Sequence, residues 1–178
     1  MVYRVALMTG RNHHIVIVGA MASGKTTVGR GIATRLGLKF VDSDEQIRGL
    51  TGRDAARIAE ADGVPALHRL ELQLFWEALG SPHASVIAAA ASVIEDEEVR
   101  QALESVGCVW VDADDETLRV RLGSERHRRE VSEQEARRLA GRDQLFASCA
   151  DVKVDTGSMT EHDAVSIAVE AIRGGDDE

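Results

Sequence analysis

Short apolar runs and longer amphipathic segments alternate along most of the chain. The short runs are rich in β-branched residues, as buried parallel strands are, whereas apolar residues at helical spacing predict helices. Strands are predicted at residues 14–19, 38–42, 84–90, 108–113 and 151–156. Helices are predicted at residues 25–36, 44–50, 54–61, 65–79, 95–107, 114–122 and 132–148, with a last helix capped by Thr160. This alternation predicts an α/β fold: a five-stranded parallel sheet with helices on both faces.

The chain has the length and composition of one domain. Its 178 residues are 44% hydrophobic, which suffices for a core, so we expect a single domain over 1–178. Residues 1–13 are expected to form an N-terminal extension and residues 174–178 a flexible tail. No apolar run reaches the roughly 20 residues that span a membrane, and the N-terminus is too polar for a signal peptide. We therefore expect a cytoplasmic protein with no membrane partner, occurring as a monomer or weak dimer.

The charge distribution weighs against one large class of function. Acidic residues outnumber basic ones by 30 to 21, for a formal net charge of -9. A general nucleic-acid binder would normally be basic, so no nucleic-acid partner is expected. Nearly all the basic residues are arginines, so Lys25, inside a glycine-rich stretch, is conspicuous.

That stretch is GAMASGKT at residues 19–26, which matches the pattern G-x-x-x-x-G-K-[ST] between a predicted strand and a predicted helix. The glycines permit backbone shapes in which successive N–H groups point inward, and the new helix adds the positive end of its dipole. Lys25 would neutralise β- and γ-phosphate charge, and the Thr26 hydroxyl would ligate Mg²⁺. We therefore expect ATP and Mg²⁺ as cofactors. The expected nucleotide-binding residues in this segment are Gly19, Ala22, Ser23, Gly24, Lys25, Thr26 and Thr27.

Two acids follow the second predicted strand. In open parallel sheets ligands bind at the carboxyl ends of the strands, where Asp42 and Asp44 should lie. They could serve the metal, with Asp42 beside Thr26, and the hydroxyl of an acceptor molecule. The alternative is that both acids merely begin a helix, as acids often do.

The chain resembles the shikimate kinase family, within the nucleoside-monophosphate-kinase-like P-loop proteins. The resemblance is carried by residues 19–47, by TGRDAARIAEADG at 51–63, by HRLE at 68–71 and by GRDQLFASCADVKVDT at 141–156. It implies transfer of the ATP γ-phosphate to a hydroxyl of a small ring compound. It also implies substrate-binding helices over about 44–80 and a lid over about 123–131.

The resemblance assigns roles on the acceptor side. Asp44 would hold acceptor hydroxyls, and Asp42 would be the acid nearest the metal and the reacting hydroxyl. Arg142 would clamp the acceptor carboxylate, and Glu71 would lie in the substrate-side helix. On the nucleotide side, Arg119 and Arg121 could stack on adenine; the alternative is that both are solvated arginines on the surface of a helix. Arg128 or Arg126 of the lid would reach the phosphates, and we take Arg128 as the catalytic one.

Three departures from the family pattern fall on the acceptor side or in the lid. The usual F-R-x-x-E reads LHRLE here, so His68 replaces an arginine unless Arg69 takes its place. Histidine cannot reproduce the two-pronged grip of arginine on a carboxylate. A triple-glycine turn is replaced by Ala90, Ala91 and Ser92, and the lid has Arg128-Arg129 instead of Arg-Pro. The phosphate loop itself shows no such departure.

The leading hypothesis is therefore phosphorylation of shikimate to shikimate 3-phosphate. A related sugar acid, cyclitol or aminosugar remains an alternative acceptor, although the histidine- and asparagine-containing motif of gluconate kinases is missing. A non-catalytic nucleotide-binding sensor is the alternative of another class, and a nucleoside-monophosphate kinase is a weaker one. Under the leading hypothesis the partner is a small hydroxylated molecule, carboxylated or polyol.

Overall fold

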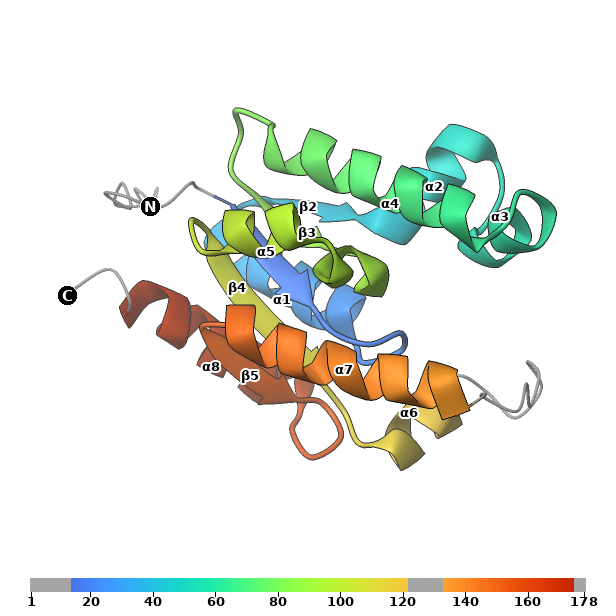
Figure 1. The fold of residues 1–178 in the computed structure, drawn as a ribbon. Coiled ribbons are helices and arrows are strands. Elements are labelled where there is room, and N and C mark those ends of the chain that lie inside the picture. The colour runs from blue at the N-terminus through green and yellow to red at the C-terminus, as the bar shows by residue number, and fades with distance from the viewer. Residues whose placement is uncertain (1–13, 122–132, 175–178) are drawn as a thin grey trace.

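The computed structural model describes residues 14–121 and 133–174, and Figure 1 shows its parallel sheet flanked by helices. The described strands form one five-stranded sheet in the order β2-β3-β1-β4-β5. Their bounds are β1 (Ile15–Val18), β2 (Lys39–Asp42), β3 (Ser85–Ala88), β4 (Gly107–Asp112) and β5 (Val152–Asp155). The predicted fold class is confirmed.

Strand β1 lies at the centre of the sheet. Its Ile15 is in register with Val86 of β3 on one side and with Gly107 of β4 on the other. After β1 the chain forms β2 and then β3, which lies between β2 and β1, and β4 and β5 are added on the opposite side of β1. The carboxyl end of β1 is therefore a topological switch point, where ligands of open α/β sheets bind.

The helices connect the strands and cover both faces of the sheet. They are α1 (Lys25–Leu36), α2 (Ser43–Thr51), α3 (Ala55–Ala61), α4 (Val64–Leu79), the 3-10 helix η1 (Ala91–Glu95), α5 (Glu97–Leu103), α6 (Asp115–Arg121), α7 (Glu133–Cys149) and α8 (Glu161–Gly174). Gly37 ends α1 in the left-handed conformation, and the Thr160 hydroxyl accepts the N–H of Asp163 in α8, both as predicted.

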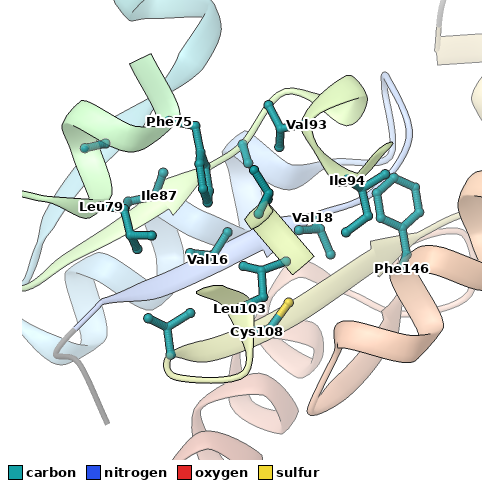
Figure 2. Packing of buried hydrophobic residues seen from close by; sticks show 14 of the residues in the cluster. Val16, Val18, Phe75, Leu79, Ile87, Val93, Ile94, Leu103, Cys108 and Phe146 are labelled. Carbon is teal, nitrogen blue, oxygen red and sulfur yellow. The ribbon is translucent and has the colours of Figure 1, made fainter. Parts of the chain in front are cut away.

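Alternate strand residues supply two separate apolar layers. On one face the β1 residues Val16 and Val18 pack with α4, η1, α5 and Phe146 of α7 (Figure 2). On the other face Ile15 and Ile17 pack against α1 and α8. Because every β1 side chain is buried, the strand reads as a continuous apolar run, as parallel strands do.

A third apolar cluster joins α2, α3 and α4 through Ile47, Ile58, Leu67 and Leu74. In Figure 1 these helices gather at the end of the sheet to which β2 points. The helices predicted to bind substrate thus share a small core of their own beside the carboxyl ends of the strands.

The stretch after β3 differs from the sequence-based expectation. The predicted strand ends at Ala88 rather than at residue 90, and the unpredicted helix η1 follows. Asp96 is extended (φ -78°, ψ 130°) and its carboxylate accepts the N–H of Val99, so α5 starts only after it. Helix α5 ends at Leu103, and Gly107, expected to end this helix, instead begins β4.

Candidate active site

The loop between β1 and α1 needs both of its glycines. Gly19 has φ 143°, and a Cβ there would lie 2.1 Å from the carbonyl oxygen of Val111. Gly24 has φ 101° and precedes the first residue of α1. Ala22 also has a positive φ, 63°, alone among the described residues other than glycine. The G-x-x-x-x-G spacing thus matches backbone shapes that side chains disfavour.

The start of α1 suits an anionic ligand. Gly24 has no side chain that could cap the helix, so the first-turn N–H groups are not bonded by an N-cap side chain. These groups and the helix dipole both favour phosphate oxygens at this point. Thr26 and Thr27, in the first turn, are exposed, so this end of α1 is open to a ligand.

Lys25 folds back over this loop. Its Nζ donates to the carbonyl oxygens of Gly19 at 3.0 Å and Ala20 at 2.8 Å. Burial lowers its pKa from 10.5 to about 8, against the opposing effect of Asp44, Asp42 and Glu71, which favour the charged form. The ammonium therefore faces three acids across the site.

Asp42 connects the loop to the end of β2. Its Oδ2 accepts the Thr26 hydroxyl at 2.7 Å, while its Oδ1 accepts the N–H groups of Asp44 at 2.9 Å and Glu45 at 3.2 Å. Asp42 therefore caps the start of α2, as the alternative interpretation proposed. Its other oxygen, Oδ2, is nevertheless bonded to Thr26 at the start of α1. A hydroxyl and a carboxylate are hard oxygen donors of the kind that Mg²⁺ prefers.

One cavity of about 780 Å³ joins the loop to the acids. Thr26, Lys25 and Asp42 line it near the loop, and Asp44 and Glu71 line it farther toward α4. The other lining residues include Ala22, Gly24, Thr27, Leu67, Ala88, Ala89, Ala90, Ala91, Arg121 and Thr156. Most of the predicted phosphate-loop residues thus share one open space with Asp44 and Glu71, whereas the predicted acceptor clamp Arg142 is not among the described residues that line it.

The two acids toward α4 are in different surroundings. Glu71 is buried and accepts the Ser92 hydroxyl; burial raises its pKa, and the Ser92 hydrogen bond opposes this. The pKa of Asp44 is also raised, first by desolvation and then by the neighbouring Asp42, whereas Lys25 acts in the opposite sense. The sequence did not reveal this hydrogen bond between Ser92 and Glu71.

Arg142 lies near Glu71 but bonds another acid. Its Nε donates to Glu95 Oε1 at 2.7 Å, and its side chain is only 14% exposed. Its positive charge also opposes the increase in the pKa of Glu71, although burial has the larger effect. The guanidinium is therefore held by η1, through a carboxylate that the sequence did not single out, and Arg142 is not among the residues of the described chain that line the cavity.

Arg121, rather than Arg119, lies at the phosphate loop. Arg119 is exposed and pairs with Glu116 on the same helix. Arg121 donates to the carbonyl oxygens of Ala22 and Ser23 in the loop. Of the two arginines expected to contact adenine, Arg121 is therefore the one that lies beside this loop, and the adenine contact itself stays a prediction. The catalytic candidate Arg128 and the lid lie outside the described residues.

Comparison with known proteins agrees with this geometry. The family model for shikimate kinase matches residues 21–173, which is most of the chain. The chain belongs to the shikimate kinase family. The shikimate kinase of Symbiobacterium thermophilum is 36% identical over 168 residues, which cover 90% of this chain and 96% of the relative. Both the family resemblance and the predicted kinase activity are confirmed.

Solved structures extend the same likeness to three dimensions. The shikimate kinase from Acinetobacter baumannii in complex with shikimate has a TM-score of 0.80 and 28% identity, over 96% of this chain and 97% of that one. A gluconokinase from Sinorhizobium meliloti has a TM-score of 0.56 and 20% identity, covers 92% of this chain and 93% of its own, and shares the fold.

Among the described residues no helix is long and apolar enough to cross a bilayer.

Within the family fold, the departures noted in the sequence occupy definite places. His68 is half-buried and Arg69 is exposed, and neither is among the described residues that line the cavity. Substitution of Arg69 for the replaced arginine thus stays a prediction. Ala90 adopts φ -61° and ψ 142°, which any residue can take, so the turn forms without glycine. Ala90 and Ala91 line the cavity where glycine would carry no side chain.

Proposed function

We propose that this chain transfers the γ-phosphate of Mg·ATP to a hydroxyl of shikimate. The observation that carries the proposal is the Thr26–Asp42 pair beside Lys25, in the cavity that also holds Asp44 and Glu71. Family membership supplies the acceptor, because the relatives are shikimate kinases.

On the donor side, the loop amides and Lys25 would hold the β- and γ-phosphates. Thr26 and Asp42 would hold Mg²⁺, which supplies neutralisation of phosphate charge when bound. Phosphoryl transfer passes through a loose transition state, so positioning and charge neutralisation dominate. Lys25, with its pKa lowered to about 8, remains mostly charged at neutral pH and can meet that charge.

On the acceptor side, Asp44 would accept hydrogen bonds from ring hydroxyls and Arg142 would hold the carboxylate. The acceptor oxygen bonds to the γ-phosphorus as the bond to the ADP oxygen breaks, and the electron pair leaves with ADP. The hydroxyl proton passes to Asp42 late in the step and then to water. Glu71 would shape the far wall of the cavity through its bond to Ser92.

A second acceptor class is favoured by one specific observation. Arg142 already shares its charge with Glu95, and His68 and Arg69, like Arg142 itself, are not among the described residues that line the cavity. This arrangement grips a carboxylate less strongly than two arginines would. A related cyclitol, sugar acid or aminosugar is therefore the second candidate acceptor.

A cytoplasmic location and a monomeric or weakly dimeric state remain predictions.

A coupled assay of ADP release tests the proposal. Mg·ATP is supplied with shikimate, quinate, gluconate, inositols or aminosugars in turn, and Lys25→Met serves as the inactive control. Shikimate should stimulate ADP release most. Stimulation by another polyol alone would replace the acceptor but keep the kinase. Nucleotide binding without stimulation by any acceptor would favour the non-catalytic sensor.

A further inference from the structure

The outer side of the phosphate loop is held by a residue that follows β5. The hydroxyl of Thr156 donates to the carbonyl oxygen of Ser23 at 2.6 Å. The backbone N–H of Thr156 donates to Asp112 of β4 at 2.9 Å, so the threonine is itself fixed to the sheet. The loop is thus tied to the strands on the other side of β1 by a hydroxyl to which the sequence assigned no role.

Arg121 completes this attachment from the last position of α6. Its Nη1 lies 3.2 Å from the Ser23 carbonyl oxygen, 3.3 Å from that of Ala22, and 2.8 Å from the Thr156 hydroxyl. Its Nη2 donates to the Thr156 carbonyl oxygen at 2.7 Å. One guanidinium therefore connects the loop, α6 and the end of β5.

The direction of these carbonyls matters for phosphate binding. The N–H and the carbonyl of one peptide group point in opposite directions. If the N–H groups of the loop converge on an anion, the carbonyls of the same peptides point away from it and need hydrogen-bond donors of their own. Ala22, moreover, has a left-handed backbone with φ 63°, which is energetically unfavourable for a residue other than glycine. Such a conformation persists only where its surroundings impose it.

We propose that Thr156 and Arg121 are positioning residues that hold the phosphate loop in its binding shape by bonding its outward carbonyls. Neither needs to touch the phosphates for this role. The inference rests on nucleotide binding within the proposed function and is independent of the acceptor's identity.

The test measures the Kd of ADP by calorimetry on the full chain. Thr156→Val keeps the shape of the side chain but removes the donor, so the Kd should rise about 3- to 10-fold, as expected for one lost hydrogen bond. Thr156→Ser restores the hydroxyl and should restore the wild-type Kd. Thr34→Val is the matched control, because its hydroxyl bonds the Arg30 carbonyl at 2.8 Å on the exposed side of α1.

Arg121→Lys keeps the charge but loses the planar fork, and it is a surface change that should leave folding intact. Its Kd should rise as well, and less than additively when combined with Thr156→Val, because both groups bond the same carbonyl. A wild-type Kd in both single variants, with only a lower Tm, would overturn the positioning role. Failure of the wild type to bind ADP would instead overturn the proposed function.

Discussion

The hydroxyl of Thr26 donates to Oδ2 of Asp42 across 2.7 Å, joining the first turn of α1 to the end of β2. The same carboxylate caps α2 with its other oxygen, through the N–H groups of Asp44 and Glu45. One buried side chain therefore fixes both the predicted metal ligand and the start of the helices predicted to bind the acceptor. Its two tasks can be separated by substitution.

Asp42→Asn should separate capping from metal binding. Asparagine is as good an N-cap as aspartate, so the free energy of unfolding should change little. The lost charge should raise the Mg²⁺ concentration needed for half-maximal activity by about 10- to 100-fold. A magnesium titration of ADP release checks this. Asp54→Asn, which alters the cap of α3 in the same way, is the control and should leave the titration unchanged.

Because of Lys25, stability and affinity for ADP should change in opposite directions as pH rises. Its pKa is about 8 in the folded chain, against an ordinary value of 10.5, so between these values the unfolded chain binds more protons. Stability should therefore rise with pH across this window relative to Lys25→Met. Affinity for ADP should fall as pH rises through about 8, because phosphate needs the ammonium form.

Calorimetric titration with ADP from about pH 6.5 to about pH 9.5 measures the second effect. Lys25→Met should bind weakly with no loss of affinity across that range. Lys39→Met, on the exposed start of β2, should keep the wild-type slope. An ADP affinity of the wild type that stays constant to about pH 9.5 would show that Lys25 does not meet the phosphates.

Arg142→Lys tests the acceptor clamp. Lysine keeps the charge but loses the fork that bonds Glu95 and a carboxylate together. The KM for shikimate should rise about 10- to 100-fold, as for a lost charged hydrogen bond, while the KM for ATP stays the same. Equal increases in both KM values would argue for a general distortion instead.

Glu95→Gln tests how the negative charge of Glu95 affects the binding of a carboxylated acceptor. Glutamine can still accept the Nε–H of Arg142, but it no longer competes for the positive charge. The KM for a carboxylated acceptor should therefore fall about 2- to 5-fold, with no change for a neutral polyol. Glu98→Gln, in the first turn of α5, is the control. A higher KM for shikimate would mean that the ion pair itself orients Arg142.

Alanine substitutions at two glycines in different helices should change stability in opposite directions. A Cβ at Gly31 of α1 would lie 2.5 Å from Cγ2 of the buried Val165 in α8, whereas a Cβ at Gly49 of α2 would meet nothing within 4 Å. Gly31→Ala should lower the free energy of unfolding by about 1–3 kcal/mol. Gly49→Ala should raise it by about 0.5–1 kcal/mol. Urea denaturation measures both, and equal stability of the two variants would contradict the described packing of α1 on α8.

The parts of the molecule that local sequence determines could be predicted. Helix α1 has the expected bounds because glycine and a helical apolar pattern mark both its ends. The loop between β1 and α1 follows from the spacing of Gly19 and Gly24, since each needs a positive φ. The meeting of Thr26 and Asp42 follows from strand order, because β1 and β2 point to the same edge.

Contacts set by tertiary packing could not be predicted in this way. Glu95 and Arg142 are 47 positions apart, and Arg121 and Thr156 are 35 apart, so no periodicity relates them. Arg119 and Arg121 lie on different sides of α6 because two residues turn a helix by about 200°. Which arginine faces the loop depends on the phase of a seven-residue helix, and its sequence leaves that phase open.

The most direct test follows the fate of the γ-phosphate by ³¹P NMR, with mass spectrometry of the acceptor. Wild-type protein with Mg·ATP and shikimate should yield one ADP and one monophosphorylated shikimate per turnover, and Asp42→Asn should slow both together. Unmodified shikimate in the presence of bound nucleotide, with ATP intact or merely hydrolysed, would contradict the account.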